Sequence, residues 1–236
     1  MTDTQTKREN IGAVFDVDGT LLDSMGIWED VGARYVKSLG KVPEEKLGEI
    51  LFPMSLEEGA AYVKERYKVP FATDEIIARV LGIIRDYYYE EAPLKDGAKE
   101  LLEALYRAGV PMVIATSSER EHVRRAFRRL GIDRYFEKIL TCSEIGQGKS
   151  SPLIYQRAAE TLGMSPGEIW VFEDAFHALR TAKSAGFHTV AVYDKASAKD
   201  QKALKNEAEV YVKSLREVLM AEETGSGLRA PVCTAL

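Results

Sequence analysis

The stretch IGAVFDVDGTLLDS, residues 11–24, decides the fold. Residues 11–15 form a short apolar run, which predicts a strand buried on both faces, as in a parallel sheet. The run ends in two carboxylates, Asp16 and Asp18. In an open parallel sheet, ligands collect outside the carboxyl ends of the strands, and side chains two residues apart on a strand point to the same side. The two acids are therefore predicted to share one small space, where a divalent cation would offset their repulsion.

The second half of the chain has the alternating pattern of an α/β protein. From about residue 92 onward, short apolar runs alternate with segments of helical apolar spacing, which predicts βαβ units. The predicted strands cover residues 110–115, 138–141, 169–172, 188–193 and 209–212, and the predicted helices cover residues 98–107, 119–130, 152–162 and 175–185. Together with the first strand, these elements predict a Rossmann-like parallel sheet flanked by helices.

The segment between the first strand and residue 92 has a different character. It carries no strand pattern, and its apolar spacing predicts helices at 25–39, 43–51, 55–67 and from 73 onward. Ser55 and Glu58 have the spacing of a capping box at the start of the third helix. We therefore predict an α/β core (1–23 and 92–224), an inserted all-helical cap (24–91) and a tail (225–236). A cap attached beside the two acids could close over them and exclude water.

Composition and charge exclude several classes of protein. The net charge of −5 gives no general basic surface for nucleic acid. Two cysteines are too few for a disulfide framework and fit a reducing cytosol. The first ten residues lack the apolar core of a secretory signal, and no apolar run approaches the roughly 18 residues of a membrane span. We expect a cytoplasmic monomer or weak homodimer that binds neither nucleic acid nor membrane.

The chain ends in CTAL, residues 233–236, which has the form of a prenylation signal. The tail before it carries a single basic residue, Arg229, and no second membrane anchor. We therefore expect residues 225–236 to form a frayed tail rather than a lipid anchor.

Thr116 and Ser117 follow directly after the predicted strand at 110–115. A hydroxyl at this place, with the free amides of the following turn, can bind phosphate oxygens. The segment would serve equally as an N-cap for the helix predicted from Glu119. The segment alone does not decide between these two roles.

Lys149 lies in the segment GQGKSS, residues 146–151, just before the helix predicted at 152–162. A lysine in such a place is commonly a solvated surface residue. Gly-Lys-Ser also ends a P-loop, but that motif needs a glycine five residues before Gly148, where this chain has Ser143. A P-loop is therefore excluded, whereas the sequence still allows Lys149 to neutralise a bound anion.

Glu173 and Asp174 follow the predicted strand at 169–172. Two adjacent acids are commonly part of a surface turn. Here they stand between an apolar strand and a helix, so they are predicted to face the same sheet edge as Asp16. Together these acids would add oxygen ligands for the divalent cation expected beside Asp16.

Taken in order, the four polar segments resemble the four motifs of the haloacid dehalogenase superfamily. The first is Asp-x-Asp-Gly-Thr at 16–20, and Thr116, Lys149 and the acids at 173–174 match the second, third and fourth. The third motif has Ser150 and Leu153 where the commonest form has proline and aspartate. The position of the insert is similar to the family's helical-cap type. The branch that the chain resembles contains β-phosphoglucomutase-like and phosphoglycolate phosphatase-like proteins.

The resemblance implies nucleophilic phosphoryl transfer with Mg²⁺ as the cofactor. Asp16 would attack phosphorus and form an aspartyl-phosphate. Asp18 would protonate the leaving oxygen and then activate water. The groups that bind the phosphoryl oxygens would be Thr116, Ser117 and Lys149, and those that hold the metal would be Asp16, Asp18, Glu173 and Asp174.

Three other functions are weighed against a phosphatase. The mutases carry a histidine twelve residues after the nucleophile and an arginine in the cap, whereas this chain has Trp28 and no arginine between residues 50 and 59. Haloacid dehalogenation uses neither Asp18 nor the metal acids. A non-catalytic phosphate-binding module would not need Asp18. We therefore expect a Mg²⁺-dependent phosphatase acting on a small phosphorylated metabolite, such as a sugar phosphate, with the mutase as the alternative.

Overall fold

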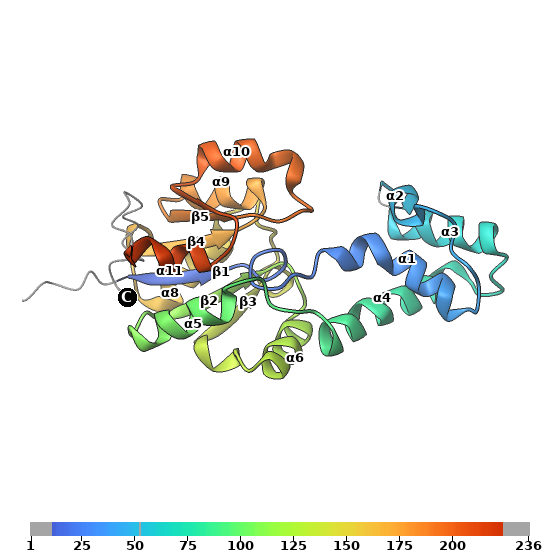
Figure 1. Ribbon diagram of the computed structural model, residues 1–236, viewed down its shortest axis with the longest axis horizontal. Helices are drawn as coiled ribbons and strands as arrows, with labels where there is room; N and C mark the ends of the chain where they lie inside the picture. Colours follow the sequence, from blue (N-terminus) through green and yellow to red (C-terminus); the bar gives the residue numbers. More distant parts are fainter. Residues whose placement is uncertain (1–10, 52, 224–236) are drawn as a thin grey trace, which may run out of the picture. The chain divides into compact units, whose positions relative to one another are not determined.

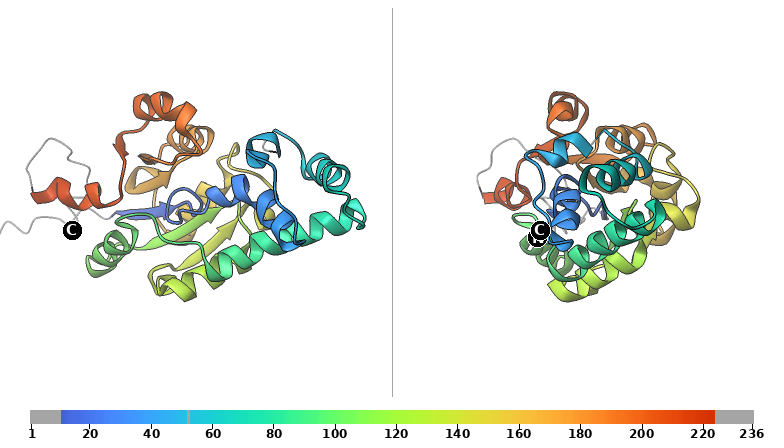
Figure 2. Two further views of the ribbon diagram at one scale, coloured as in Figure 1. Left: turned by 45° about the vertical axis from the view of Figure 1, so that its right-hand side comes forward. Right: turned by 90° about the vertical axis from the view of Figure 1, so that its right-hand side faces the viewer.

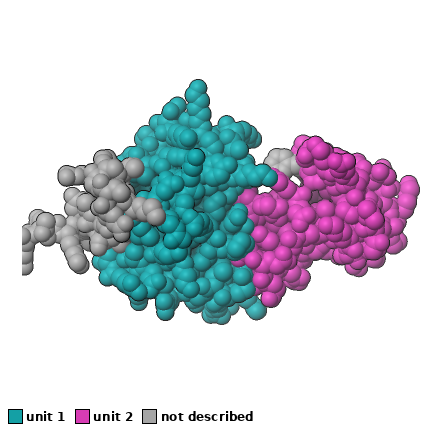
Figure 3. Space-filling view, in the orientation of Figure 1, with its two compact units in different colours: residues 1–23, 93–236 teal, residues 24–92 magenta. Residues whose placement is uncertain are grey.

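The computed structural model describes residues 11–51 and 53–223 (Figure 1). The predictions for the first ten residues and for the tail from 225 therefore lie outside the described residues. The chain divides into two compact units, an α/β unit (residues 1–23 and 93–236) and a helical unit (residues 24–92), which Figure 3 distinguishes by colour. Within the α/β unit, the two chain segments that lead to and from the helical unit lie side by side. The amide of Asp23 donates to the carbonyl of Pro93, and the amide of Lys95 to that of Leu21, each at 2.9 Å.

One parallel sheet of order β3-β2-β1-β4-β5-β6 forms the centre of the α/β unit. Its strands are β1 (Gly12–Phe15), β2 (Met112–Thr116), β3 (Lys138–Thr141), β4 (Ile169–Glu173), β5 (His188–Val192) and β6 (Val210–Val212). The chain runs outward from β1 through β2 to β3 and then returns to β4 on the other side of β1. The carboxyl ends of β1, β2 and β4 therefore meet at the point where the strand order reverses, which is where open α/β sheets bind ligands. The predicted Rossmann-like fold is confirmed.

Helices cover both faces of this sheet (Figures 1 and 2). They are α5 (Ala98–Arg107), α6 (Arg120–Leu130), α7 (Cys142–Ile145), α8 (Leu153–Leu162), α9 (Phe176–Ser184), α10 (Gln201–Glu207) and α11 (Arg216–Glu223). Successive strand residues face opposite ways. Val14 shares a buried apolar cluster with Ile154 of α8, whereas Phe15 contacts Phe136, which packs on Phe127 of α6. The central strands β1, β2 and β4 are thus buried on both faces, as their unbroken apolar runs indicate.

The helical unit consists of α1 (Gly26–Ser38), α2 (Leu47–Leu51), α3 (Leu56–Tyr67) and α4 (Thr73–Glu90). The capping box expected at the start of α3 is present, because Ser55 Oγ accepts from the Glu58 amide at 3.2 Å and Glu58 Oε2 accepts from the Ser55 amide at 2.8 Å. Side chains from all four helices surround a cavity of about 370 Å³. Tyr35, on this cavity's wall, is buried, and its hydroxyl has no hydrogen-bond partner among the described residues.

Three helices of the α/β unit were not predicted: α7, α10 and α11. Helix α10 shows why, since Leu204 is its one buried residue and so it presents no periodic apolar stripe. Helix α7 has just four residues and begins where Thr141 Oγ1 accepts from the Glu144 amide. Across the described ranges, no helix combines the length and the apolar character needed to cross a bilayer.

Candidate active site

The polar residues predicted at strand ends come together at the centre of the sheet edge. Asp16 directly follows β1, and Glu173 is the last residue of β4. The two strands are in register, and the Asp16 amide donates to the Phe172 carbonyl at 3.0 Å. Lys149 arrives from the loop between α7 and α8. Parallel pairing alone therefore fixes where two of the three side chains emerge.

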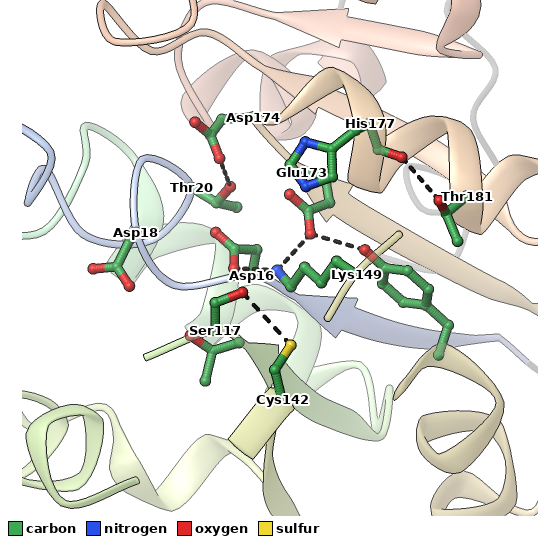
Figure 4. A network of polar contacts seen from close by, with 12 residues as sticks. Asp16, Asp18, Thr20, Ser117, Cys142, Lys149, Glu173, Asp174, His177 and Thr181 are labelled. Atoms are coloured by element: carbon green, nitrogen blue, oxygen red, sulfur yellow. Dashed lines mark hydrogen bonds and ion pairs between the residues drawn. The ribbon is translucent and has the colours of Figure 1, made fainter. Parts of the chain in front are cut away.

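A buried lysine joins two of the carboxylates. Lys149 Nζ donates to Asp16 Oδ1 and also to Glu173 Oε1, the latter at 2.5 Å (Figure 4). Lys149 is 6% exposed, Asp16 is 7% exposed and Glu173 is 1% exposed. The surface roles considered for Lys149 and for the acidic pair are therefore excluded. A buried ammonium needs such charged partners, because its desolvation alone is strongly unfavourable.

Asp174 extends the cluster on the side of the Asp16–Thr20 loop. Its Oδ1 accepts a hydrogen bond from Thr20 Oγ1 at 3.4 Å. The loop can approach this closely because residue 19 is glycine: a Cβ there would lie 2.5 Å from Asp174 Oδ2, and its φ of +83° also favours glycine. The Gly-Thr of the first motif is thus explained by contacts with the acid of the fourth.

Burial and mutual repulsion perturb these acids. Burial raises the pKa of Asp16 to about 7, with Lys149 opposing the rise and Glu173 and Asp18 adding to it. Burial, together with the charges of Asp16 and Glu173, raises the pKa of Asp174 well above its ordinary value. Burial opposes the charged form of Lys149, but Asp16 and Glu173 outweigh it and raise the pKa of the ammonium. The cluster therefore carries more carboxylates than its own cation can neutralise.

Asp16, Glu173 and Asp174 form a candidate metal site. One oxygen from each carboxylate lies within 4.8 Å of the others, and all three residues are buried. When they are ionised, three carboxylates against the ammonium of Lys149 leave two uncompensated negative charges. Carboxylate oxygens are the ligands that Mg²⁺ takes from proteins. The charge and the donor atoms of the site therefore fit a divalent cation.

The carboxylate of Asp18 lies apart from this cluster (Figure 4). Its Oδ2 accepts a hydrogen bond from Ser118 Oγ at 2.5 Å. The two acids were expected to share one small space as alternate residues of a strand, but β1 ends at Phe15 and Asp18 forms an isolated bridge with Leu22. The charge of Asp18 still adds to the rise in the pKa of Asp16, so the two acids interact. The rule for alternate residues of a strand does not apply beyond the strand end.

The two hydroxyls predicted to bind phosphate occupy different settings. Thr116 is the last residue of β2, fully buried, and its Oγ1 accepts from the Ser118 amide at 3.0 Å. Ser117 is exposed, with its Oγ 3.5 Å from Cys142 Sγ. Neither residue caps α6, whose N-cap is Glu119 and has no side-chain cap hydrogen bond. The alternative helix-capping role is therefore not seen.

Three polar residues of the site were missed from the sequence. Thr20 lies within the first motif, two residues after Asp18, and Ser118 directly follows Ser117, so both stood in segments already singled out but were given no role. Tyr155, whose hydroxyl donates to Glu173 Oε1 at 3.0 Å, gives no such signal. It lies on the apolar face of α8, where its spacing indicates core packing.

Comparison with known proteins identifies the family to which the chain belongs. The family model for haloacid dehalogenase-like hydrolases matches residues 12–186, and the chain belongs to this family. The predicted class of enzyme, a hydrolase of this family, is thereby confirmed.

Two named relatives and one solved structure are similar to the chain over most of its length. The validoxylamine A 7'-phosphate phosphatase of Streptomyces hygroscopicus subsp. limoneus is 30% identical, over 87% of this chain and 94% of that protein. The phosphorylated carbohydrates phosphatase of Thermotoga maritima is 27% identical, over 75% of this chain and 82% of that protein. A structure described as a putative beta-phosphoglucomutase from Thermotoga maritima superposes with a TM-score of 0.77 at 25% identity, covering 91% of this chain and 99% of its own.

Proposed function

We propose that this protein is a Mg²⁺-dependent phosphatase that hydrolyses a small phosphomonoester, such as a sugar phosphate, through an aspartyl-phosphate on Asp16. The observation that carries the proposal is the buried set of Asp16, Lys149, Glu173 and Asp174 at the sheet edge. Both named relatives are called phosphatases, one of them for phosphorylated carbohydrates, and this supports the substrate class.

In the first half-reaction, an oxygen of Asp16 forms a bond to phosphorus as the bond to the leaving oxygen breaks. Asp18 gives its proton to that oxygen. Lys149, held against Asp16 Oδ1, favours the ionised nucleophile. Asp16, Glu173 and Asp174 would hold Mg²⁺, which supplies positive charge for the phosphoryl oxygens when bound. Thr116 and Ser117 are assigned to those same oxygens.

In the second half-reaction, Asp18 is a carboxylate and takes a proton from water. The water oxygen forms a bond to phosphorus as the Asp16–phosphorus bond breaks, so inorganic phosphate is released and Asp16 is restored. In the structure, the carboxylate that would take this proton accepts a hydrogen bond from Ser118 Oγ. Asp18 stays assigned to the metal site as well, beside Asp16, Glu173 and Asp174. The helical unit would supply the cap that excludes bulk water.

The test is phosphate release from a panel of phosphorylated metabolites, measured with Mg²⁺ and with EDTA. Asp16→Asn is expected to reduce turnover by at least about 10³-fold, because it removes the nucleophile. Asp23→Asn, at an exposed acid of the same segment, is the matched control and should retain turnover within about twofold. Release that persists in EDTA, or in Asp16→Asn, would contradict the proposal. Isomerisation of a sugar phosphate without release would replace the phosphatase with the mutase.

Asp18→Asn separates an enzyme from a phosphate-binding module. The substitution leaves the three-carboxylate cluster intact, so Mg²⁺ binding measured by calorimetry should survive. Turnover should fall by about 10²–10⁴-fold, the usual contribution of general acid–base catalysis. Equal turnover in Asp18→Asn and the wild type would remove Asp18 from the mechanism.

A further inference from the structure

Tyr155 is a buried tyrosine that the mechanism does not use. It is 0% exposed and lies in the apolar cluster beneath the sheet, with its ring centroid 6.1 Å from that of Phe187. Its hydroxyl nevertheless reaches out of this cluster and donates to Glu173 Oε1 at 3.0 Å. A tyrosine needed for packing alone could be a phenylalanine. The hydroxyl therefore needs a separate explanation.

The same oxygen of Glu173 also accepts from Lys149. The Nζ–Oε1 distance is 2.5 Å, so Oε1 has two donors. A carboxylate oxygen has about two lone-pair sites, and both sites of Oε1 are then occupied. The other oxygen, Oε2, is left as the atom that Glu173 can offer to a cation. Lys149 and Tyr155 together thus set which edge of the carboxylate faces the metal site.

Of the two donors to Glu173 Oε1, Lys149 is the one that also contacts the proposed nucleophile. Its ammonium is shared with Asp16, and Asp16 changes from a carboxylate to an acyl phosphate and back under the proposed function. The hydrogen bond of Tyr155 joins it to Glu173 and not to Asp16, so the bond keeps both of its partners when Asp16 changes. A neutral phenol also adds a donor without changing the charge of the cluster.

We propose that Tyr155 is a positioning residue of the metal site: its hydroxyl fixes the Glu173 carboxylate so that Oε2 faces the cation. The inference rests on the proposed function, because it assumes that Asp16, Glu173 and Asp174 bind Mg²⁺. Partners that orient metal ligands typically change metal affinity by 10–100-fold when removed.

The experiment is calorimetric titration of Mg²⁺ into the full-length protein and its Tyr155→Phe variant. The variant should bind Mg²⁺ at least about tenfold more weakly. In phosphate-release assays, the Mg²⁺ concentration for half-maximal activity should rise by the same factor, while kcat at saturating Mg²⁺ stays within about threefold. Tyr35→Phe is the matched control: Tyr35 is equally buried, and its hydroxyl has no partner among the residues described. Its Mg²⁺ affinity should equal that of the wild type.

The outcomes separate this inference from the proposed function. Equal Mg²⁺ affinity in Tyr155→Phe and the wild type, with lower thermal stability alone, would make Tyr155 a structural residue and overturn the inference while leaving the phosphatase standing. Wild-type protein that binds Mg²⁺ but releases no phosphate would overturn the phosphatase, and a weakened Tyr155→Phe would still support the inference. Wild-type protein that binds no Mg²⁺ would overturn both.

Discussion

The two units of this protein bury their interiors by different means. At the sheet edge of the α/β unit, the buried groups are ionised or strongly polar, and each contacts a partner of opposite charge or a hydrogen-bond donor. The interior of the helical unit is built from apolar side chains around a cavity of about 370 Å³. There, even the buried Tyr35 hydroxyl is without a hydrogen-bond partner in the part of the chain that the structure describes.

The difference follows from what each kind of interior can tolerate. A buried charge without a partner costs several kcal/mol, so every member of the charged cluster constrains the others. An apolar interior loses roughly 1 kcal/mol for a missing methyl group, so it can change its side chains one at a time. The charged cluster of the α/β unit is therefore the more constrained interior, whereas the helical interior can accept a change at one side chain without leaving a buried charge unpaired.

The strongest test of this contrast is Lys149→Met. In the metal-free protein it leaves Asp16 and Glu173 buried side by side without their cation, so we expect a loss of about 3–5 kcal/mol of unfolding free energy. Denaturant titration measures this loss. Lys183→Met is the matched control, because Lys183 forms an exposed pair with Glu207 that is worth at most about 1 kcal/mol. Similar losses in the two variants would show that the buried cluster is not a special constraint.

Sequence reasoning found the parts of the site that backbone topology determines. Asp16, Glu173 and Asp174 were predictable because parallel strands deliver their carboxyl ends to one edge. The direction of the Asp18 side chain was not, since it depends on the turn after β1 and on Ser118, 100 residues away. Tyr155 was hidden for a related reason: its ring satisfies the apolar pattern of α8, and the role of its hydroxyl appears only when Glu173 is placed beside it.

The second test uses pH and metal together. The pKa of Asp16 rises from its usual 3.8 to about 7 in the folded, metal-free protein. The folded state thus binds this proton more tightly than the unfolded chain, and the resulting stability is present below pH 3.8 and lost as the pH rises through about 7. Mg²⁺ competes with that proton. We therefore expect Mg²⁺ to raise the melting temperature more at pH 8 than at pH 5.

The size of the metal effect at pH 8 is set by mass action: Mg²⁺ at 100 times its Kd adds about 2.7 kcal/mol. Thermal unfolding with Mg²⁺ and with EDTA, across this pH range, measures it. Asp16→Asn serves as the comparison. Without metal, its stability should not show the fall that the ionisation of Asp16 causes as the pH rises through about 7. A Mg²⁺ effect that is equal at both pH values would argue against binding at the protonatable cluster.

The smallest expected effects are those of Gly59→Ala and Gly82→Ala, which test whether the helical unit tolerates an added methyl group. Gly59 lines the cavity, and a Cβ there would meet Leu51 Cδ2 at an ordinary 3.7 Å. Gly59→Ala should stabilise the protein by about 0.5–1 kcal/mol, because α3 gains a better helix former without a clash. Gly82→Ala, in α4 with nothing within 4 Å of the new Cβ, should give the same gain and isolates helix propensity from packing.

Gly48→Ala is the opposing case within the same unit. Its Cβ would lie 2.1 Å from the Glu29 carbonyl oxygen, a backbone atom that cannot swing aside, so we expect a loss of about 1–3 kcal/mol. Thermal melts of the three variants rank these effects, and phosphate release should be unchanged within about twofold in Gly59→Ala. Should Gly59→Ala instead destabilise the protein as Gly48→Ala does, the helical interior would be as tightly specified as the charged cluster. If Gly59→Ala is stable and Gly48→Ala is not, the helical unit accepts added side-chain volume at its cavity but not where α1 and α2 are in contact.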